Sequence, residues 1–273
     1  MASLRRKLTG YLSLMPKKEL GQHWLHDRDV LAAIADEAML TKQDTVLEIG
    51  PGLGTLTSEL LRQAGNVTAV EFDSDLARKL PGQFPGTNLT VVNDDILQFD
   101  LSSLPAGYKV VANVPYYITS KIVERLLTSD NKPSVAVLLV QKEVAERLAA
   151  EAGDMSILAI SAQAYATVHM GGVVPAELFT PPPKVDSAVV VLQARQSPLV
   201  DPADERIFFR AVKAGFSARR KKLRSSLSGG LGISKDSALE ILEQAEISPD
   251  QRAQDLSIQD WNRLVQVLKK RTI

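Results

Sequence analysis

The sequence predicts an α/β fold, with a doubly wound and mostly parallel sheet, followed by a small all-α C-terminal domain. Strand-like and helix-like patterns alternate from about residue 28, which is typical of parallel sheets whose strands are joined by helices. The segment "SVAVLLVQ" (134–141) is apolar at nearly every position, as expected of a strand that helices cover on both faces. Beyond residue 205 the pattern is helical to the end.

Apolar runs bounded by turn residues mark the strands. We predict them at 45–50, 66–73, 88–95, 109–114, 134–141, 168–174 and 187–194. Apolar residues at helical spacing predict helices over about 30–39, after 54, around 76–80, from 119, from 142 and near 156–166. Thr119 is the predicted cap of its helix, and Ser257 with Asp260 is the predicted capping box of the last helix.

The polar stretch 194–205, which contains two prolines, predicts a linker between two domains. We therefore predict a basic N-terminal arm over 1–26, a ligand-binding domain over 27–196 and a helical domain over 197–273. The arm has no apolar core or cleavage site of a secretory signal, so a basic arm is favoured and an organellar targeting peptide stays open.

Composition excludes several classes of site. The 273 residues include no cysteine, which excludes disulfides and thiolate metal sites and favours a reducing cytoplasm. Three histidines, His23, His26 and His169, are too scattered to suggest a metal centre. No apolar run approaches the roughly 20 residues of a membrane span. We expect neither metal nor membrane association.

The formal net charge is zero, yet the basic residues are segregated. Acid-free runs at 1–18, 206–224 and 269–271 carry five, eight and three cations. Such segregation creates a local positive field and favours a nucleic-acid partner. The densest stretch contains five cations in six residues, which we predict to bind RNA phosphates: Arg219, Arg220, Lys221, Lys222 and Arg224.

The first predicted strand leads into "EIGPGLGTLT". Gly50, Gly52 and Gly54 allow a tight turn and close approach of a ligand. Glu71 ends the next strand, and a carboxylate there can accept hydrogen bonds from both hydroxyls of a ribose. The cofactor therefore contains a nucleoside.

Two such cofactors, NAD and S-adenosylmethionine (SAM), can be separated. NAD loops usually follow G-x-G-x-x-G, whereas here Pro51 lies within the loop and Thr55 stands where the third glycine would fall. SAM has no phosphate and does not need that spacing. The third strand ends in "NDDI", where Asp95, or Asp94, offers an acceptor for the adenine amino group. We predict SAM.

The fourth strand ends in "NVPYYI". Pro115 fixes its own φ and biases Val114 towards an extended conformation, so the Val114 carbonyl is held in one direction. That carbonyl and the Asn113 amide oxygen can both accept hydrogen bonds from one exocyclic amino group, while Tyr116 offers a face for a base. Two acceptors favour a pyramidal nitrogen, whose lone pair can then attack the sulfonium methyl.

In these motifs the sequence closely resembles the KsgA family of small-subunit rRNA adenine N6,N6-dimethyltransferases. The resemblance covers nearly the whole chain and includes "KKELGQHWL" (17–25), "QKEVAERL" (141–148), "FTPPPKVDSAV" (179–189) and "FSARRKKLRSSL" (216–227). It implies a Rossmann-like SAM-dependent methyltransferase that dimethylates two adjacent adenosines near the 3′ end of small-subunit rRNA. It also implies a monomeric cytoplasmic enzyme that acts on an assembly intermediate during ribosome biogenesis.

The resemblance implies residue roles. Cofactor contacts fall to His23, Leu25, Gly50, Gly52, Glu71, Asp95 and Asn113. Catalytic contacts to the target base fall to Asn113, Val114, Tyr116 and Phe179, with Phe179 facing Tyr116 across a flipped adenine. This chain departs from the family at His23 and Trp24, where relatives have Asn-Phe, and at Tyr117, which is often Asn.

Three alternatives remain. An erythromycin-resistance type methyltransferase shares the core but modifies large-subunit rRNA, and "FTPPPKVDSAV" argues against it. A catalytically idle ribosome-assembly or transcription factor would not need the complete set of site residues. A nicotinamide dehydrogenase is disfavoured by the loop spacing and by the absence of a plausible hydride-handling base.

Overall fold

A computed structural model describes residues 21–271, which form two compact units. The first contains the residues up to Ala145 together with Met170–Gln193, and the second contains Glu146–His169 together with the residues from Ala194 onward. The cations of the predicted basic arm before residue 21 lie outside the described residues. The predicted domain boundaries, 1–26, 27–196 and 197–273, stay a prediction.

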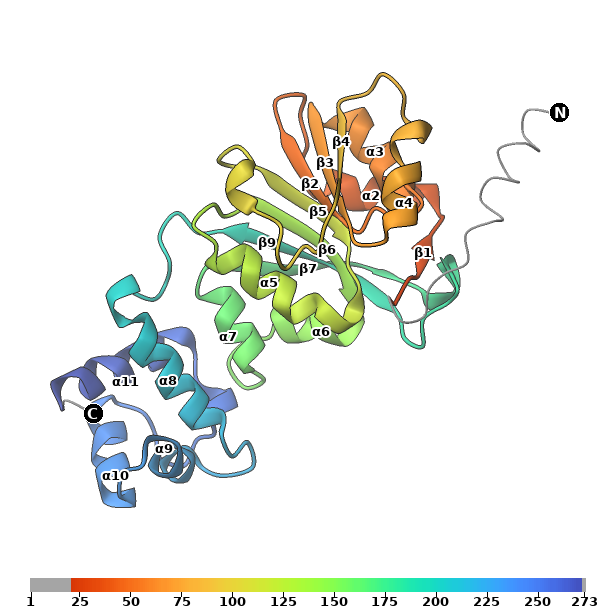
Figure 1. The fold of residues 1–273 in the computed structure, drawn as a ribbon. Helices are drawn as coiled ribbons and strands as arrows, with labels where there is room; N and C mark the ends of the chain where they lie inside the picture. The colour runs from red at the N-terminus through yellow and green to blue at the C-terminus, as the bar shows by residue number, and fades with distance from the viewer. Residues whose placement is uncertain (1–20, 272–273) are drawn as a thin grey trace. The chain divides into compact units, whose positions relative to one another are not determined.

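The central element is a seven-stranded sheet with the order β4-β3-β2-β5-β6-β9-β7 (Figure 1). Its strands are β2 (Thr45–Ile49), β3 (Asn66–Glu71), β4 (Leu89–Asn93), β5 (Lys109–Asn113), β6 (Val135–Gln141), β7 (Ala166–Val174) and β9 (Ser187–Ala194). The pairs from β4 through β6 are parallel, and β9 joins β6 antiparallel. All seven predicted strands are present, and the predicted fold class is confirmed.

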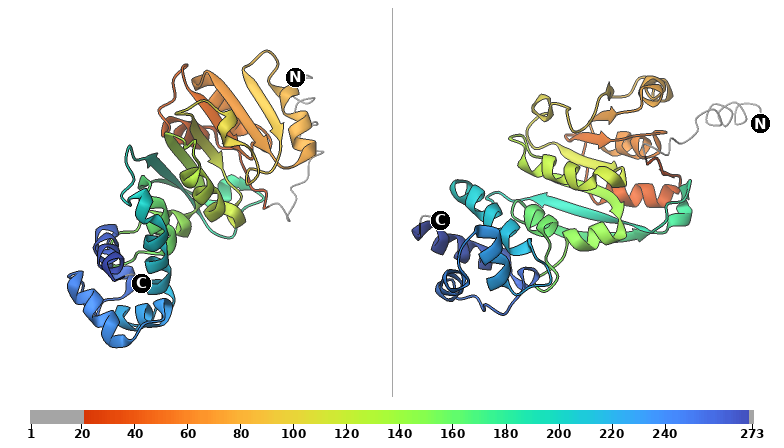
Figure 2. Two further views of the ribbon diagram at one scale, coloured as in Figure 1. Left: turned by 60° about the vertical axis from the view of Figure 1, so that its left-hand side comes forward. Right: turned by 60° about the horizontal axis from the view of Figure 1, so that its bottom comes forward.

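Helices cover both faces of the sheet (Figures 1 and 2). They are α2 (Arg28–Asp36), α3 (Thr55–Gln63), α4 (Ser74–Lys79), α5 (Thr119–Thr128) and α6 (Lys142–Leu148). The helix α7 (Ile157–Gln163) belongs to the second unit. Because parallel crossovers are right-handed and the chain reverses its travel across the sheet between β4 and β5, α3 and α4 lie on one face and α5 on the other. The core on one side packs Leu31 and Ile34 of α2 against fully buried strand valines such as Val111.

The predicted cap at Thr119 is wrong, because a 3₁₀ turn precedes α5. This turn, η4 (Tyr116–Ile118), starts from Pro115 in an extended conformation (φ −60°, ψ 126°), and Ile118 occupies the N-cap position. The Thr119 hydroxyl instead donates backwards to the Tyr116 carbonyl oxygen at 3.2 Å. The proline-stiffened turn therefore fixes the two tyrosines at the end of β5.

The second unit contains α8 (Glu205–Phe216), α9 (Leu223–Leu231), α10 (Lys235–Gln244) and α11 (Ile258–Lys270). The predicted capping box is confirmed: Ser257 Oγ accepts from the Asp260 N–H, and the Asp260 carboxylate accepts from the Ser257 N–H. Trp261 is fully buried and stacks on Phe216 with centroids 6.1 Å apart. No helix within residues 21–271 is long and apolar enough to cross a membrane.

Candidate active site

A cavity of about 200 Å³ lies at the carboxyl ends of β2, β3, β4 and β5. The neighbours β2 and β5 form the point at which strand order reverses, where doubly wound folds bind ligands. Every predicted catalytic and cofactor residue except Phe179 lines this cavity: His23, Leu25, Gly50, Gly52, Glu71, Asp95, Asn113, Val114 and Tyr116. The role of each residue stays a prediction.

The glycine-rich loop after β2 uses its three glycines differently, although each has a positive φ. A Cβ at Gly50 would meet no atom within 4 Å, so its backbone is open to a ligand. A Cβ at Gly52 would lie 3.3 Å from the Trp24 ring, and one at Gly54 would collide with Leu80 at 2.7 Å. Gly50 therefore fits a ligand contact, whereas a side chain at Gly54 would have to displace the ends of the Leu80 and Phe84 side chains and would also adopt a strained φ of +81°.

Glu71 ends β3 and is 5% exposed. One carboxylate oxygen accepts from the Gly52 N–H at 3.0 Å, and the other accepts from the Asp73 N–H at 2.8 Å. Burial raises the pKa of Glu71, and the backbone hydrogen bonds oppose that rise. Each oxygen keeps a second lone pair, so this carboxylate can still accept from a ribose diol.

The loop after β4 carries both aspartates that were considered for the adenine. The Asp94 Oδ1 accepts from the Asp95 N–H at 2.8 Å, and the Asp95 Oδ1 accepts from the Leu97 N–H at 2.9 Å. Both residues line the cavity. Each therefore holds one oxygen fixed by the backbone and has a second oxygen for a ligand, so the choice between them stays open.

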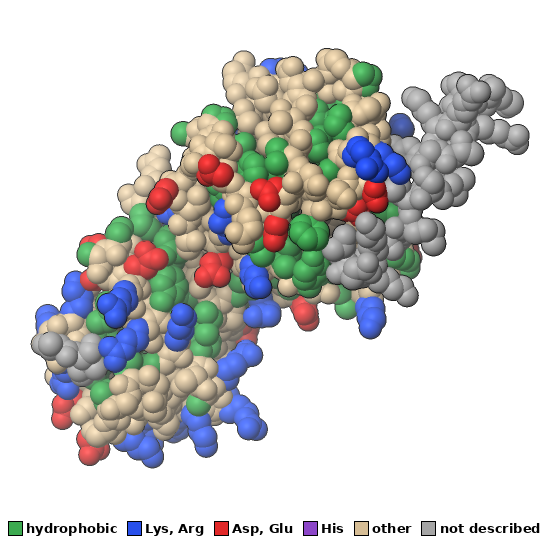
Figure 3. Space-filling model, in the orientation of Figure 1, with side chains coloured by type: hydrophobic (Ala, Val, Ile, Leu, Met, Phe, Trp, Pro, Cys, Tyr) green, Lys and Arg blue, Asp and Glu red, His purple; other side chains and the backbone are tan. Residues whose placement is uncertain are grey.

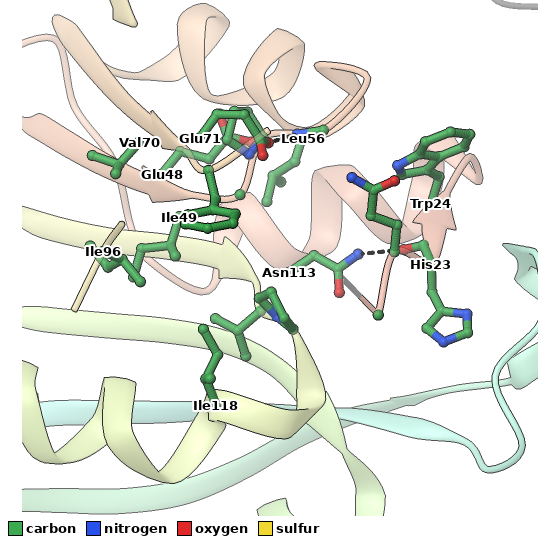
Figure 4. A pocket seen from close by; sticks show the side chains of 18 of the residues that line it. His23, Trp24, Glu48, Ile49, Leu56, Val70, Glu71, Ile96, Asn113 and Ile118 are labelled. Carbon is green, nitrogen blue, oxygen red and sulfur yellow. Dashed lines mark hydrogen bonds between the residues drawn. The ribbon is translucent and has the colours of Figure 1, made fainter. Parts of the chain in front are cut away.

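Asn113 is the last residue of β5, and its amide is oriented by the backbone of the segment before β1 (Trp24–Leu25) (Figure 4). The Asn113 Nδ2 donates to the His23 carbonyl oxygen at 3.1 Å. This hydrogen bond turns the Oδ1 away from His23, as Figure 4 shows. The oxygen is thereby presented as an acceptor rather than the amino group as a donor.

Tyr116 lies next to His23. Its hydroxyl is hydrogen-bonded to Ser187 Oγ at 2.6 Å, and burial raises the pKa of the phenol. The His23 ring stacks on Tyr116 with centroids 5.6 Å apart and planes at 18°, and its Nδ1 donates to the Pro181 carbonyl oxygen at 2.7 Å. In this structure the ring that lies against Tyr116 is therefore His23.

Phe179 is the predicted catalytic residue that does not line the cavity. It begins β8 (Phe179–Thr180), which pairs antiparallel with β1, and it lies opposite Leu25. Its side chain is 2% exposed and belongs to the core between sheet and helices. Its role opposite Tyr116 stays a prediction.

Glu48 is a cavity residue that the sequence analysis missed. It is 1% exposed on β2, accepts from the Thr57 hydroxyl at 2.6 Å, and burial raises its pKa to about 8. The available signal was an acid inside the apolar strand "TVLEIG". At neutral pH this carboxyl is mostly protonated and can donate as well as accept.

Trp24 also lines the cavity, and its indole N–H is buried without an acceptor among the described residues. Because buried donors are normally paired, a ligand that brings an acceptor to this wall fits the site. The carboxylate of a bound amino-acid moiety is such an acceptor.

Four of the predicted RNA-binding cations lie on the turn between α8 and α9, and Arg224 lies in the first turn of α9, all within the second unit. Arg219, Arg220, Lys221, Lys222 and Arg224 are all exposed. Leu223 and Leu227, both almost fully buried, anchor the start of α9. Lys222 pairs with Asp250 at 2.8 Å, an acid that the local sequence does not reveal. Figure 3 shows Lys and Arg side chains gathered over this unit.

Comparison with known proteins extends these observations. The family model described as ribosomal RNA adenine dimethylase matches residues 14–270. The ribosomal RNA small subunit methyltransferase A of Dehalococcoides mccartyi is 42% identical over 268 residues, covering 97% of this chain and 92% of that protein. Its counterpart in Clostridioides difficile is 40% identical over 261 residues, covering 92% of this chain and 90% of that protein.

Two solved structures match nearly the whole chain. A dimethyladenosine transferase from Plasmodium falciparum has a TM-score of 0.80 at 28% identity, covering 92% of this chain and 99% of its own. The 23S rRNA methyltransferase ErmE has a TM-score of 0.74 at 31% identity, covering 90% and 99%. The fold of nearly the whole chain is therefore shared with a dimethyladenosine transferase and with a 23S rRNA methyltransferase.

Proposed function

The chain belongs to the ribosomal RNA adenine dimethylase family, and from this premise we propose that it dimethylates N6 of two adjacent adenosines near the 3′ end of small-subunit rRNA, using SAM. The observation that carries the proposal is the orientation of Asn113. Its hydrogen bond to His23 leaves an amide oxygen facing the cavity at the end of β5, where an exocyclic amino group would be held.

The residues of the cavity fit SAM. Gly50 offers open backbone, the Glu71 carboxylate offers lone pairs to a ribose, and Asp95 or Asp94 offers an oxygen to an adenine amino group. The buried Trp24 N–H, which has no acceptor within residues 21–271, suits the methionine carboxylate. When bound, SAM supplies a sulfonium methyl group that accepts the nitrogen lone pair.

The chain's own residues orient the target nitrogen. The Asn113 Oδ1 and the Val114 carbonyl oxygen accept hydrogen bonds from the two N–H groups of N6. These hydrogen bonds reduce the delocalisation of the nitrogen lone pair into the ring and direct the lone pair towards the methyl donor. Tyr116 supports the flipped base, with Phe179 as the proposed opposing ring. For each methyl group gained, the S–CH3 bond of SAM would break, S-adenosylhomocysteine would leave and one N6 proton would pass to water. The second transfer requires the same slot to readmit a monomethylated nitrogen.

Small-subunit rRNA is favoured over large-subunit rRNA. The relatives that match at 40–42% identity are named as small-subunit enzymes, whereas the large-subunit enzyme ErmE is 31% identical. The proposed substrate is the rRNA of a small-subunit assembly intermediate in the cytoplasm. One chain acts alone, and the exposed cations Arg219–Arg224 bind phosphates.

The proposal is tested by incubating the protein with labelled SAM and either unmethylated small subunits or large subunits, followed by nucleoside mass spectrometry. We expect two N6,N6-dimethyladenosines per small subunit and none on the large subunit. Asn113→Ala is the inactive control. Label on large-subunit rRNA would favour the ErmE-like alternative. Absence of transfer, together with a cellular phenotype that survives Asn113→Ala, would favour an assembly factor without catalysis.

A further inference from the structure

Tyr117 carries an exposed aromatic ring that has no role in the proposed methyl transfer. It is 63% exposed, yet it lines the same cavity as Asn113 and Tyr116. Among the described residues its ring has no aromatic or cationic neighbour at stacking distance, and its hydroxyl has no hydrogen-bond partner. Exposed aromatic side chains beside nucleic-acid-binding sites offer faces on which bases stack.

The local backbone explains why adjacent tyrosines face different ways. In the 3₁₀ turn η4, with about three residues per turn, successive side chains diverge by about 120°. Tyr116 turns inward to Ser187, and its neighbour is therefore directed to the rim. The Ile118 N–H donates to the Pro115 carbonyl oxygen at 3.2 Å, which fixes this turn.

Gly21 supports the Tyr117 ring from behind. A Cβ at Gly21 would lie 3.4 and 3.6 Å from two carbons of that ring, so the glycine backbone is packed directly on it. Gly21 also has φ +59°, a conformation that disfavours other residues. The ring is thus backed by main chain on one side and open to solvent on the other.

We propose that Tyr117 stacks on the base of the nucleotide next to the flipped adenosine. This inference rests on the proposed function and adds a second base-binding position to it. When one adenosine is flipped out of the stack, the neighbouring nucleotide loses a stacking partner. Because the backbone joins the two nucleotides, the neighbour stays next to the entrance of the cavity. An exposed aromatic face one residue away from Tyr116 replaces the lost contact. In a pair of adjacent targets, the nucleotide held by Tyr117 is the other adenosine.

The effect belongs to RNA binding rather than to chemistry. A base stacked on an aromatic side chain contributes about 1–3 kcal/mol, which corresponds to about a 5- to 150-fold change in affinity. Tyr117→Asn should therefore raise KM for unmethylated small subunits by about that factor. The value of kcat and the dissociation constant of SAM should stay within about twofold of the wild type. Tyr117→Phe, which keeps the ring and removes the hydroxyl, should restore KM.

Steady-state methylation of small subunits and calorimetric SAM binding provide these values, with thermal unfolding as a check on folding. Met39→Ala is the matched control, because Met39 is 73% exposed in the same unit but does not line the cavity. An unchanged KM in Tyr117→Asn overturns the inference and leaves the proposed function intact. Weakened SAM binding also overturns it, because Tyr117 would then contact the cofactor. If the wild type does not methylate small subunits at all, the proposed function is wrong, and the inference that rests on it is wrong with it.

Discussion

At the residue scale, His23 combines two contacts that act on different parts of the site. Its carbonyl oxygen fixes the Asn113 amide, whereas its ring covers Tyr116. A base between two rings needs about 7 Å, twice the roughly 3.4 Å spacing of stacked bases. The observed 5.6 Å is smaller, so a base can lie on the face of Tyr116 that His23 covers only after the His23 ring has moved.

Removing the His23 ring should therefore strengthen the binding of RNA rather than the binding of SAM. In His23→Ala the carbonyl that holds Asn113 remains, but no ring has to be displaced. Aromatic pairs contribute about 0.5–1.5 kcal/mol, so we expect KM for small subunits to fall about two- to tenfold. His23→Phe, which keeps Tyr116 covered, is the control and should not lower KM. A KM in His23→Ala that equals the wild-type value would contradict this account.

Glu48 makes stability depend on pH. Its folded-state pKa, about 8, lies above the unfolded value near 4.5, so the folded protein binds an extra proton between these limits. The stability that this proton provides is fully present below pH 4.5 and is lost as pH rises through 8. Glu48→Gln removes this titration and keeps an acceptor for Thr57. Compared with the wild type, we expect Tm of the variant to improve progressively from pH 5 to pH 9, and a constant difference would refute the assignment.

At the element scale, the turn between α8 and α9 displays cations while its flanks are buried. Lys222 forms an exposed ion pair with Asp250, whereas Arg220 and Lys221 have no ion pair within the described chain. Their separation from acids favours contact with phosphates, and each phosphate contact adds roughly 0.7–0.9 to the slope of log affinity against log salt.

Reversing the charges of Arg220 and Lys221 to Glu should weaken binding to small subunits and lower that slope by about 2. Binding is measured by sedimentation at several salt concentrations. Lys79→Glu with Lys235→Glu changes the net charge equally at exposed positions on α4 and α10, and it should have a smaller effect. Equal losses in both double variants would indicate a general charge effect instead of a local site.

The elements that the sequence predicted well are those with a strong physical pattern. The strand at Val135–Gln141 is buried on both faces, and the box at Ser257 and Asp260 has a fixed spacing. The two-residue strands β1 and β8 have no periodicity, so the sequence could not reveal them. The Thr119 cap failed because a tight turn competed with the helix start.

The site was predictable to the extent that residues stand at strand ends. Glycine, carboxylate and amide side chains at the ends of parallel strands must converge on one edge, which located Gly50, Glu71 and Asn113. Contacts between distant segments could not be predicted, because no local pattern records them. The Lys222–Asp250 pair and the covering of Tyr116 by His23 are two examples.

At the scale of the whole molecule, the second unit is not one continuous stretch of chain. Its early segment is held by later residues: the Leu199 N–H donates to the Ala164 carbonyl oxygen at 2.8 Å, and the Tyr165 hydroxyl donates to Glu205 at 2.6 Å. Ending the chain at residue 196 would remove these partners and uncover α7, which packs on α8.

A chain that ends at residue 196 should therefore unfold at a lower temperature than the full chain. Limited proteolysis should cut it first within 146–169, because that segment loses its hydrogen bonds and its packing. The full chain, treated in parallel, should resist cleavage there. A truncated protein with the same Tm and the same resistance would show that residues 146–169 need no later partner.

The same discontinuity has a consequence for how the protein is made. Translation delivers Glu146–His169 well before Gln254, whose carbonyl oxygen accepts from the N–H groups of Gly153 and Met155. The strand β9 that extends the sheet beside β6 also emerges only after that segment. The second unit therefore lacks part of its backbone hydrogen bonding until residue 254 has been made, about 100 residues after Gly153.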